Sequence, residues 1–346
     1  MMNSVIMSKE RLHYIDIAKG VLILMVVYGH VYGVNQSINH PLLYYIHLSA
    51  NSFVAYYMPC FFVITGFCSN FKKPFKEFLS NSVKTIVLPA FSFSLLFFIL
   101  ARQFDLLSIR EFIKLELFYG GEFWFLSSLF LARLMYWSIS RLFSDRSLAL
   151  LCIIFFVIGY SLNSFPHKYE CWWFIHAIIL MPFLGLGQKL RSIDLTFLEK
   201  VWTILLTSVS LHALTIYLSH IGVLQIDYFY NVPVITQMFL EMTATMFLPL
   251  VLLSLSGSLT IFAVSQKIRA NKVLEYLGRN SLTIYCFQGF VLGVVYHRIG
   301  GAISPTDNTL KCIMLLTVGF ILTMLICCII AYLLNQKCLR FFVGKF

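Results

Sequence analysis

Ten apolar segments, separated by short polar stretches, follow one another along the chain. They cover residues 17–35, 50–69, 83–101, 123–142, 147–164, 172–188, 201–220, 236–256, 280–297 and 312–334. Each is close to the ~20 residues that a helix needs to cross the hydrocarbon core of a bilayer. The apolar residues run continuously instead of alternating with polar ones, which does not favour the strands of a membrane barrel. The pattern therefore predicts an all-α, polytopic membrane protein with ten transmembrane helices.

Lysine and arginine are distributed unevenly between the two sets of loops that ten spans create. Of the 26 basic residues, 20 fall on the side of the N-terminus. The other six are Arg102, Arg110, Lys114, Lys168, Arg298 and Lys311. Because cytoplasmic loops carry an excess of Lys and Arg, we expect both termini to be cytoplasmic. No small-residue cleavage site follows the first segment, so we expect it to act as an uncleaved signal-anchor.

The composition agrees with a membrane protein and excludes several other classes. The chain is 59% hydrophobic and 12% charged, whereas soluble domains average about 25% charged residues. The net charge of +11 comes from residues that punctuate apolar segments, so nucleic-acid binding is not expected. The nine cysteines show no Cys-x-x-Cys spacing, and we predict neither a disulfide framework nor a metal site. Because no connection is long enough for a soluble domain, residues 1–346 are predicted to form one transmembrane domain.

The first apolar segment carries ionisable residues along one face. Eleven residues separate Lys19 from His30, which brings both within about 20° of one direction and ~16 Å apart along a helix. An ionisable ring inside the membrane is costly, so function is the default hypothesis for His30. Neutral near pH 7, it can take a proton from a hydroxyl. Lys19 is suited to an anionic cofactor at the cytoplasmic edge, and Asp16 lies one turn before it.

Other polar groups in or beside the segments are candidates for binding a substrate. Gln237 and Glu241 are four residues apart and share a helix face. Glu241 is suited to orienting a base or binding a sugar hydroxyl, and equally to a helix–helix hydrogen bond. Glu122 and Trp124 stand at the start of the fourth segment, and Tyr57 is one of the aromatic residues that could line a carbohydrate site. His176 and His212 are expected to be packing residues.

Four short motifs follow one another along the chain. They are Arg11-Leu-His-Tyr-Ile-Asp-Ile-Ala-Lys-Gly with Val26-Val-Tyr-Gly-His30, Met58-Pro-Cys-Phe-Phe-Val-Ile-Thr-Gly-Phe67, Glu122-Phe-Trp-Phe-Leu126 and Leu277-Gly-Arg-Asn-Ser-Leu-Thr-Ile-Tyr285. In this order they resemble motifs of the membrane-bound acyltransferase-3 family, particularly its fucose-O-acetylase-like branch. Two positions depart from the family pattern. Tyr57 and Gln288 stand where the family often has histidine, which preserves hydrogen bonding but removes a titratable group. The role of a second histidine is therefore in doubt, whereas the role of His30 is not affected.

The resemblance implies transfer of an acyl group, usually acetyl from acetyl-CoA, to a hydroxyl of a cell-envelope carbohydrate. It implies a protein of the bacterial inner membrane, with membrane lipids and a carbohydrate or lipid-linked glycan as partners. His30 would be the general base or a transient acetyl carrier, with Glu241 as a second catalytic residue. Lys19, Lys72, Lys73 and Arg279 would meet the CoA phosphates. The acceptor would meet residues of the remaining candidate set, which comprises Asp16, Tyr57, Glu122, Trp124, Gln237 and Gln288.

Two alternatives remain open from the sequence. In the first, the chain is a proton-coupled transporter or a lipid-linked glycan flippase, with His30, Gln237 and Glu241 along the pathway. The absence of repeated halves disfavours this alternative. In the second, the chain is a family member that only binds, because Tyr57 and Gln288 replace histidines. The presence of both Lys19 and His30 disfavours that interpretation.

Overall fold

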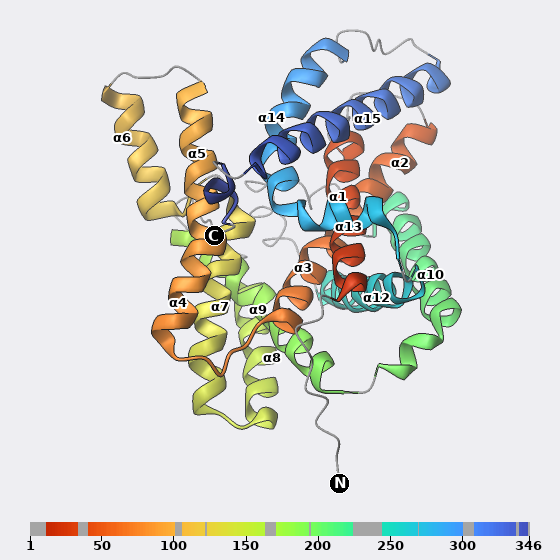
Figure 1. Cartoon of the computed structure of the whole chain (residues 1–346). Coiled ribbons are helices and arrows are strands. Elements are labelled where there is room, and N and C mark those ends of the chain that lie inside the picture. The colour runs from red at the N-terminus through yellow and green to blue at the C-terminus, as the bar shows by residue number, and fades with distance from the viewer. Residues whose placement is uncertain are drawn as a thin grey trace.

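The computed structural model describes residues 12–33, 41–100, 106–121, 123–162, 171–193, 195–223, 244–268, 270–299, 308–336 and 339–344. Helices account for almost all of this part of the chain (Figure 1). The α-helices are α1 (His13–Gly33), α2 (Pro41–Ser52), α3 (Val54–Cys68), α4 (Phe75–Ser82), α5 (Leu88–Leu100), α6 (Leu106–Lys114), α7 (Trp124–Leu142), α8 (Asp145–Leu162), α9 (Phe174–Ser192), α10 (Val201–His220), α12 (Ala244–Ile268), α13 (Lys272–Arg279), α14 (Ser281–Ile299) and α15 (Thr309–Leu334). Shorter turns of helix are η1 (Val83–Val87), η2 (Leu115–Tyr119), η3 (Cys171–Trp173), η4 (Thr196–Glu199) and η7 (Arg340–Val343).

The helices agree with the predicted all-α membrane fold. Each of the ten predicted segments coincides, at least in part, with a helix of the described chain. Among the described residues, six stretches are both long and apolar enough to cross a membrane. They are His13–Tyr32, Leu42–Cys68, Phe75–Leu100, Val201–His220, Val251–Ile268 and Thr309–Leu334. Shorter apolar helices lie at Ser147–Gly159 and Ser281–Val295. The chain is thus a multi-pass membrane protein, while ten crossings and cytoplasmic termini remain predictions.

One predicted segment boundary was wrong. The eighth segment was expected to end at residue 256, but α12 continues to Ile268. Gly257 does not end this helix. A Cβ at that position would overlap the ring of Tyr56, so the glycine lets α12 approach α3 closely. Between α5 and α7, residues 106–119 form α6 and η2.

Helix α1 has a central position in the bundle. It contacts α2, α3, α12, α13, α14 and α15, and Figure 1 shows it between the group formed by α4–α9 and the helices α2, α10 and α12. Its apolar residues Ile17, Leu22 and Ile23 are fully buried. The helix that carries Lys19 and His30 is therefore held by other helices and not by lipid alone.

Glycines set two close helix crossings near α1. Gly20 of α1 and Gly278 of α13 lie where these two helices cross. Gly66 of α3 and Gly187 of α9 lie where those two helices cross. A Cβ on any of the four would overlap a backbone carbonyl of the facing helix. Small residues let helix backbones approach closely in membranes, where no hydrophobic effect drives apolar helices together. These crossings fix the ends of α1, α3, α9 and α13 relative to one another.

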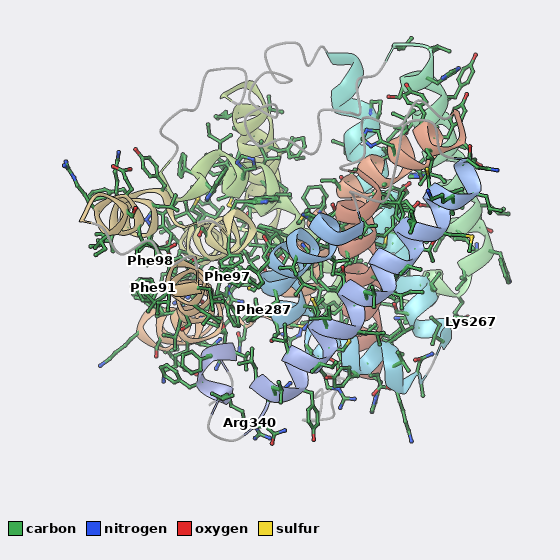
Figure 2. The ribbon with its side chains drawn as sticks, turned by 90° about the horizontal axis from the view of Figure 1, so that it is seen from above. Phe91, Phe97, Phe98, Lys267, Phe287 and Arg340 are labelled. Carbon is green, nitrogen blue, oxygen red and sulfur yellow. The ribbon has the colours of Figure 1, made fainter. Side chains whose placement is uncertain are left out.

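Phenyl rings pack α5 against α14. Phe287 lies 5.2 Å from Phe93 and 5.4 Å from Phe97 between ring centroids, and Phe97 stacks on Phe290 at 5.4 Å. Figure 2 shows Phe97 and Phe287 in the interior of the view from above, with Lys267 and Arg340 at the edges. The contact positions α14, whose Gln288 points to α1.

Candidate active site

His30 lies in the last turn of α1, about 25 Å along the helix from its first residue. Its Nδ1 is 2.8 Å from the carbonyl oxygen of Val26, one turn earlier. Because a carbonyl only accepts hydrogen bonds, this contact places the ring proton on Nδ1. Nε2 is then the nitrogen that carries the lone pair. The local backbone therefore prepares His30 as a base at Nε2.

Gln288 comes from α14 to the same imidazole. Its Nε2 lies 3.4 Å from His30 Nδ1, and its side chain is 3% exposed. Because Nδ1 already carries the ring proton and the amide nitrogen is itself a donor, this contact is not a hydrogen bond, and Gln288 holds the ring only by packing against it. The sequence placed Gln288 among the substrate-binding residues, and the structure brings it to the predicted base.

Tyr285 continues this contact from α14 to the start of α7. Its ring centroid is 5.5 Å from that of Phe125 and 6.2 Å from that of Phe123. Its hydroxyl is within hydrogen-bond reach of the Phe125 backbone. Tyr285 and Gln288 are three residues apart and so share a face of α14. This face links His30 to the Glu122–Leu126 motif, which the sequence had only placed at the start of a helix.

An aromatic cluster of Trp124, Trp173 and His176 lies at the start of α7 and α9. The centroid of the His176 ring is 5.3 Å from Trp124 and 5.3 Å from Trp173, and the two indoles are 6.4 Å apart. Trp124 and Trp173 are both partly exposed. The cluster has the ring faces on which a sugar can stack, and only Trp124 of its three members was predicted to bind substrate.

The backbone beside this cluster is strained. Trp172 and Trp173 have φ of 53° and 54°, in the left-handed region that bulky residues rarely occupy. Their indole nitrogens donate to the carbonyls of Leu117, at 3.1 Å, and Gly121, at 3.5 Å. Strain of this kind persists where surrounding contacts impose it, and it gathers at functional sites.

A basic cluster of Lys19, Arg133 and Arg191 lies at the other end of α1, around Cys68. The charges of all three, and that of Asp16, act on the Cys68 sulfur. Arg191 Nη1 donates to the Ser69 carbonyl at 3.3 Å. The cysteine itself is exposed. Residues of α1, α7 and α9 thus bring three positive charges and one negative charge near the end of α3.

Asp16 and Tyr57, two of the predicted substrate-binding residues, are both buried. Asp16 is 7% exposed, and its backbone packs against Gly278. Its charge acts on Cys68 together with those of the basic cluster. It is about 21 Å from His30 along α1. Tyr57 is 1% exposed on α3.

Three predicted phosphate ligands have contacts with residues outside the basic cluster. Lys73 pairs with Glu77 on the next turn, while the carbonyls of Lys72 and Lys73 accept hydrogen bonds from Arg141 at 3.0 and 2.6 Å. Arg279 belongs to α13, where its Nη2 is 3.7 Å from Glu275. Of the predicted cations, Lys19 alone is found among the charges that act on Cys68.

Glu275 is tied to the start of α1. His13 Nδ1 is 3.1 Å from its carboxylate. This hydrogen bond, aided by the charges of His13 and Arg279, lowers the pKa of Glu275 below its ordinary value of 4.5. The pair fixes α13 against α1 on the side of the basic cluster.

Glu122, Gln237 and Glu241 lie outside the described residues, and their predicted roles stay predictions. The sequence interpretation missed Arg133, Arg191, Trp173 and Tyr285 as site residues. For Arg133 a signal existed, because it lies in the middle of the predicted segment 123–142 and intramembrane charges indicate function. No comparable sequence signal distinguishes Arg191 as a site residue from the other basic residues of the predicted cytoplasmic side.

A family model described as "Acyltransferase domain" (Acyl_transf_3) matches residues 12–332 of the chain. The match begins just before α1 and ends within α15, so it includes the basic cluster, His30 and the aromatic cluster. Searches of the curated proteins and of the solved structures found no match to this chain.

Proposed function

Because the chain belongs to the acyltransferase-3 family of membrane acyltransferases, we propose that it moves an acetyl group from acetyl-CoA to a hydroxyl of a cell-envelope carbohydrate. The observation that carries the proposal is the state of His30. Val26 holds the proton on Nδ1, so Nε2 is the basic nitrogen. A neutral imidazole of this kind is the most frequent general base in enzymes.

His30 serves either of two routes. As a general base, its Nε2 accepts the proton of the acceptor hydroxyl while the hydroxyl oxygen attacks the thioester carbonyl. The C–S bond then breaks, and His30 returns the proton to the departing thiolate. As a nucleophile, Nε2 attacks the thioester carbonyl, and the C–S bond breaks to release the thiolate. The acceptor hydroxyl then attacks the carbonyl of the acetyl-imidazole, the C–N bond breaks, and the proton of the hydroxyl neutralises the thiolate. Gln288 keeps the ring in place on both routes.

In this proposal, the end of α1 that carries Lys19 binds the acyl donor, and the end that carries His30 faces the acceptor. The basic cluster suits the phosphates of CoA, since charge-assisted hydrogen bonds to phosphate are strong. Lys19 belongs to the basic cluster. We also propose that Lys72, Lys73 and Arg279 contact the CoA phosphates. The separation of ~16 Å between Lys19 and His30 along the helix suits an extended pantetheine arm with phosphate at one end and thioester at the other.

The aromatic cluster supports the choice of a carbohydrate acceptor. Trp124, Trp173 and His176 present ring faces, and Tyr285 connects the start of α7 to the helix that carries Gln288. We propose that the sugar lies between this cluster and His30, in contact with Glu122, Gln237 and Glu241 in their predicted roles. The protein would act in a bacterial inner membrane on a surface glycan or its lipid-linked precursor.

The test uses membranes that contain the intact protein or His30→Ala at matched expression, supplied with radiolabelled acetyl-CoA and candidate glycan acceptors. We expect label in glycan, or trapped on the protein, only when His30 is present. Equal labelling by His30→Ala would contradict the assigned base. Absence of CoA-dependent labelling in both would contradict acetyl transfer and favour a transport function.

A further inference from the structure

Arg133 is a buried guanidinium with no acceptor among the described residues. It lies on α7, about 13 Å from the end of that helix at Leu142. Its side chain is 8% exposed, and its Nε is fully buried without a hydrogen-bond partner. The guanidinium carbon lies 5.1 Å from the centroid of the Phe78 ring. A ring face attracts the charge but cannot accept all five N–H groups of an arginine.

The charged side chains near Arg133 are mostly positive, so they do not neutralise its guanidinium. Lys19 and Arg191 act on the same Cys68 sulfur as Arg133 does, and Asp16 is the single carboxylate that joins them. No ion pair of Lys19, Arg133 or Arg191 is found in the described part of the chain. Burying an unpaired charge is strongly unfavourable. An anion placed among the three cations would remove that penalty and supply the missing acceptors.

We infer that Arg133, together with Lys19 and Arg191, forms a binding site for the diphosphate of the acyl donor, with Arg133 as its innermost contact. The inference rests on the proposed function, because it gives the site a donor to bind. Arg133 would draw the diphosphate into the helix bundle, beyond the loop lysines at 72 and 73. The planar guanidinium offers two parallel N–H groups to phosphate oxygens, which a surface lysine cannot do.

Cys68 is a reporter of occupancy at this site. It is exposed, whereas Cys60, Cys152, Cys286, Cys312 and Cys327 are buried. A diphosphate among the three cations would stand over its sulfur. The rate at which the uncharged reagent N-ethylmaleimide alkylates Cys68, followed by peptide mass spectrometry, therefore measures occupancy without any catalytic turnover.

The experiment uses the full chain in nanodiscs of zwitterionic lipid. The probes are inorganic pyrophosphate and the S-ethyl thioether of CoA, which has no free thiol and no acetyl group. We expect each probe to slow alkylation of Cys68 at least tenfold in the natural protein. In Arg133→Gln, protection should require at least tenfold more probe, and Arg133→Lys should fall between. Arg340→Gln, in η7 and outside the basic cluster, is the control and should behave as the natural protein does.

Four outcomes would overturn the inference or separate it from the proposed function. Equal protection in Arg133→Gln would show that Arg133 is only structural. Alkylation of the buried Cys60 in Arg133→Gln would show that this variant is misfolded, and Arg133→Lys then provides the test. Weaker protection of Cys68 in Arg133→Lys supports the inference. Full protection of Cys68 by pyrophosphate in Arg133→Lys contradicts the need for a guanidinium. Protection by phosphatidylglycerol nanodiscs alone, with nothing added by the thioether, would assign the site to a lipid headgroup. Protection by both probes in a protein that transfers no acetyl group would retain the anion site and contradict only the proposed function.

Discussion

Replacing Gln288 with leucine tests how the imidazole of His30 is held. Two groups contact His30 Nδ1, the Val26 carbonyl at 2.8 Å and the Gln288 amide at 3.4 Å. The shorter contact is within the helix of His30 itself, so a change on α14 does not remove it. The side chain of Gln288 is almost fully buried, and leucine is similar in size and leaves no polar group unpaired. The substitution therefore removes the longer contact and little else.

The size of the effect follows from these distances. The amide nitrogen of Gln288 and the protonated Nδ1 of His30 are both donors, so the substitution removes a packing contact, which is worth less than the ~1 kcal/mol of a net hydrogen bond. We expect Gln288→Leu to lower kcat/KM for acetyl transfer about threefold to fivefold. Loss of a general base costs far more, about 10²-fold to 10⁴-fold, and we expect that range for His30→Ala. We therefore predict that His30→Ala lowers kcat/KM far more than Gln288→Leu does.

The assay is the initial rate of acetyl transfer in proteoliposomes as the acetyl-CoA concentration is varied. Gly289→Ala is the matched control, because a Cβ at this neighbouring position meets nothing within 4 Å. A loss in Gln288→Leu as large as in His30→Ala would refute the reasoning, since the amide would then take part in the chemistry itself. A fully active His30→Ala would refute the role of the histidine.

Three further predictions concern packing, acid stability and the acceptor. Gly278→Val places a side chain against a carbonyl of α1 and should destabilise the fold by about 3 kcal/mol in detergent unfolding, as overpacking does, whereas Gly293→Ala, in open space, should not destabilise it. The lowered pKa of Glu275 means that its pair with His13 stabilises the fold above about pH 4.5 and loses this contribution as the pH falls further. Glu275→Gln should therefore narrow the difference in unfolding temperature between pH 7 and pH 3.5, and an unchanged difference would contradict the assignment. Trp173→Ala should raise KM for the glycan about fivefold, as loss of about 1 kcal/mol of ring contact implies, with KM for acetyl-CoA unchanged. Equal changes in both constants would argue against an acceptor role.

The sequence by itself determined the class of fold and the helix that matters most. Hydrophobic runs of the length of a bilayer fix helices directly, because an unsatisfied backbone in lipid is too costly for other structures. The prediction for residues 201–220 coincides with α10. The face shared by Lys19 and His30 also follows from helix geometry alone, since both residues are on one uninterrupted helix. The family motifs lie at fixed spacing and were readable for the same reason.

Only the tertiary structure decided which residues from different helices meet. Gln288 approaches His30 across 258 positions of sequence, and α12 runs past its predicted end because Gly257 fits under a tyrosine of α3. Many basic residues lie on the predicted cytoplasmic side, and the packing of α1, α3, α7 and α9 determines that Arg133 and Arg191 are the ones near Lys19. Lys73 pairs instead with Glu77. Hydropathy specifies which residues lie in the membrane, but lipid and protein interior are equally apolar. The faces that helices turn to one another are therefore set by close packing at small residues and by polar contacts, which depend on all the helices together.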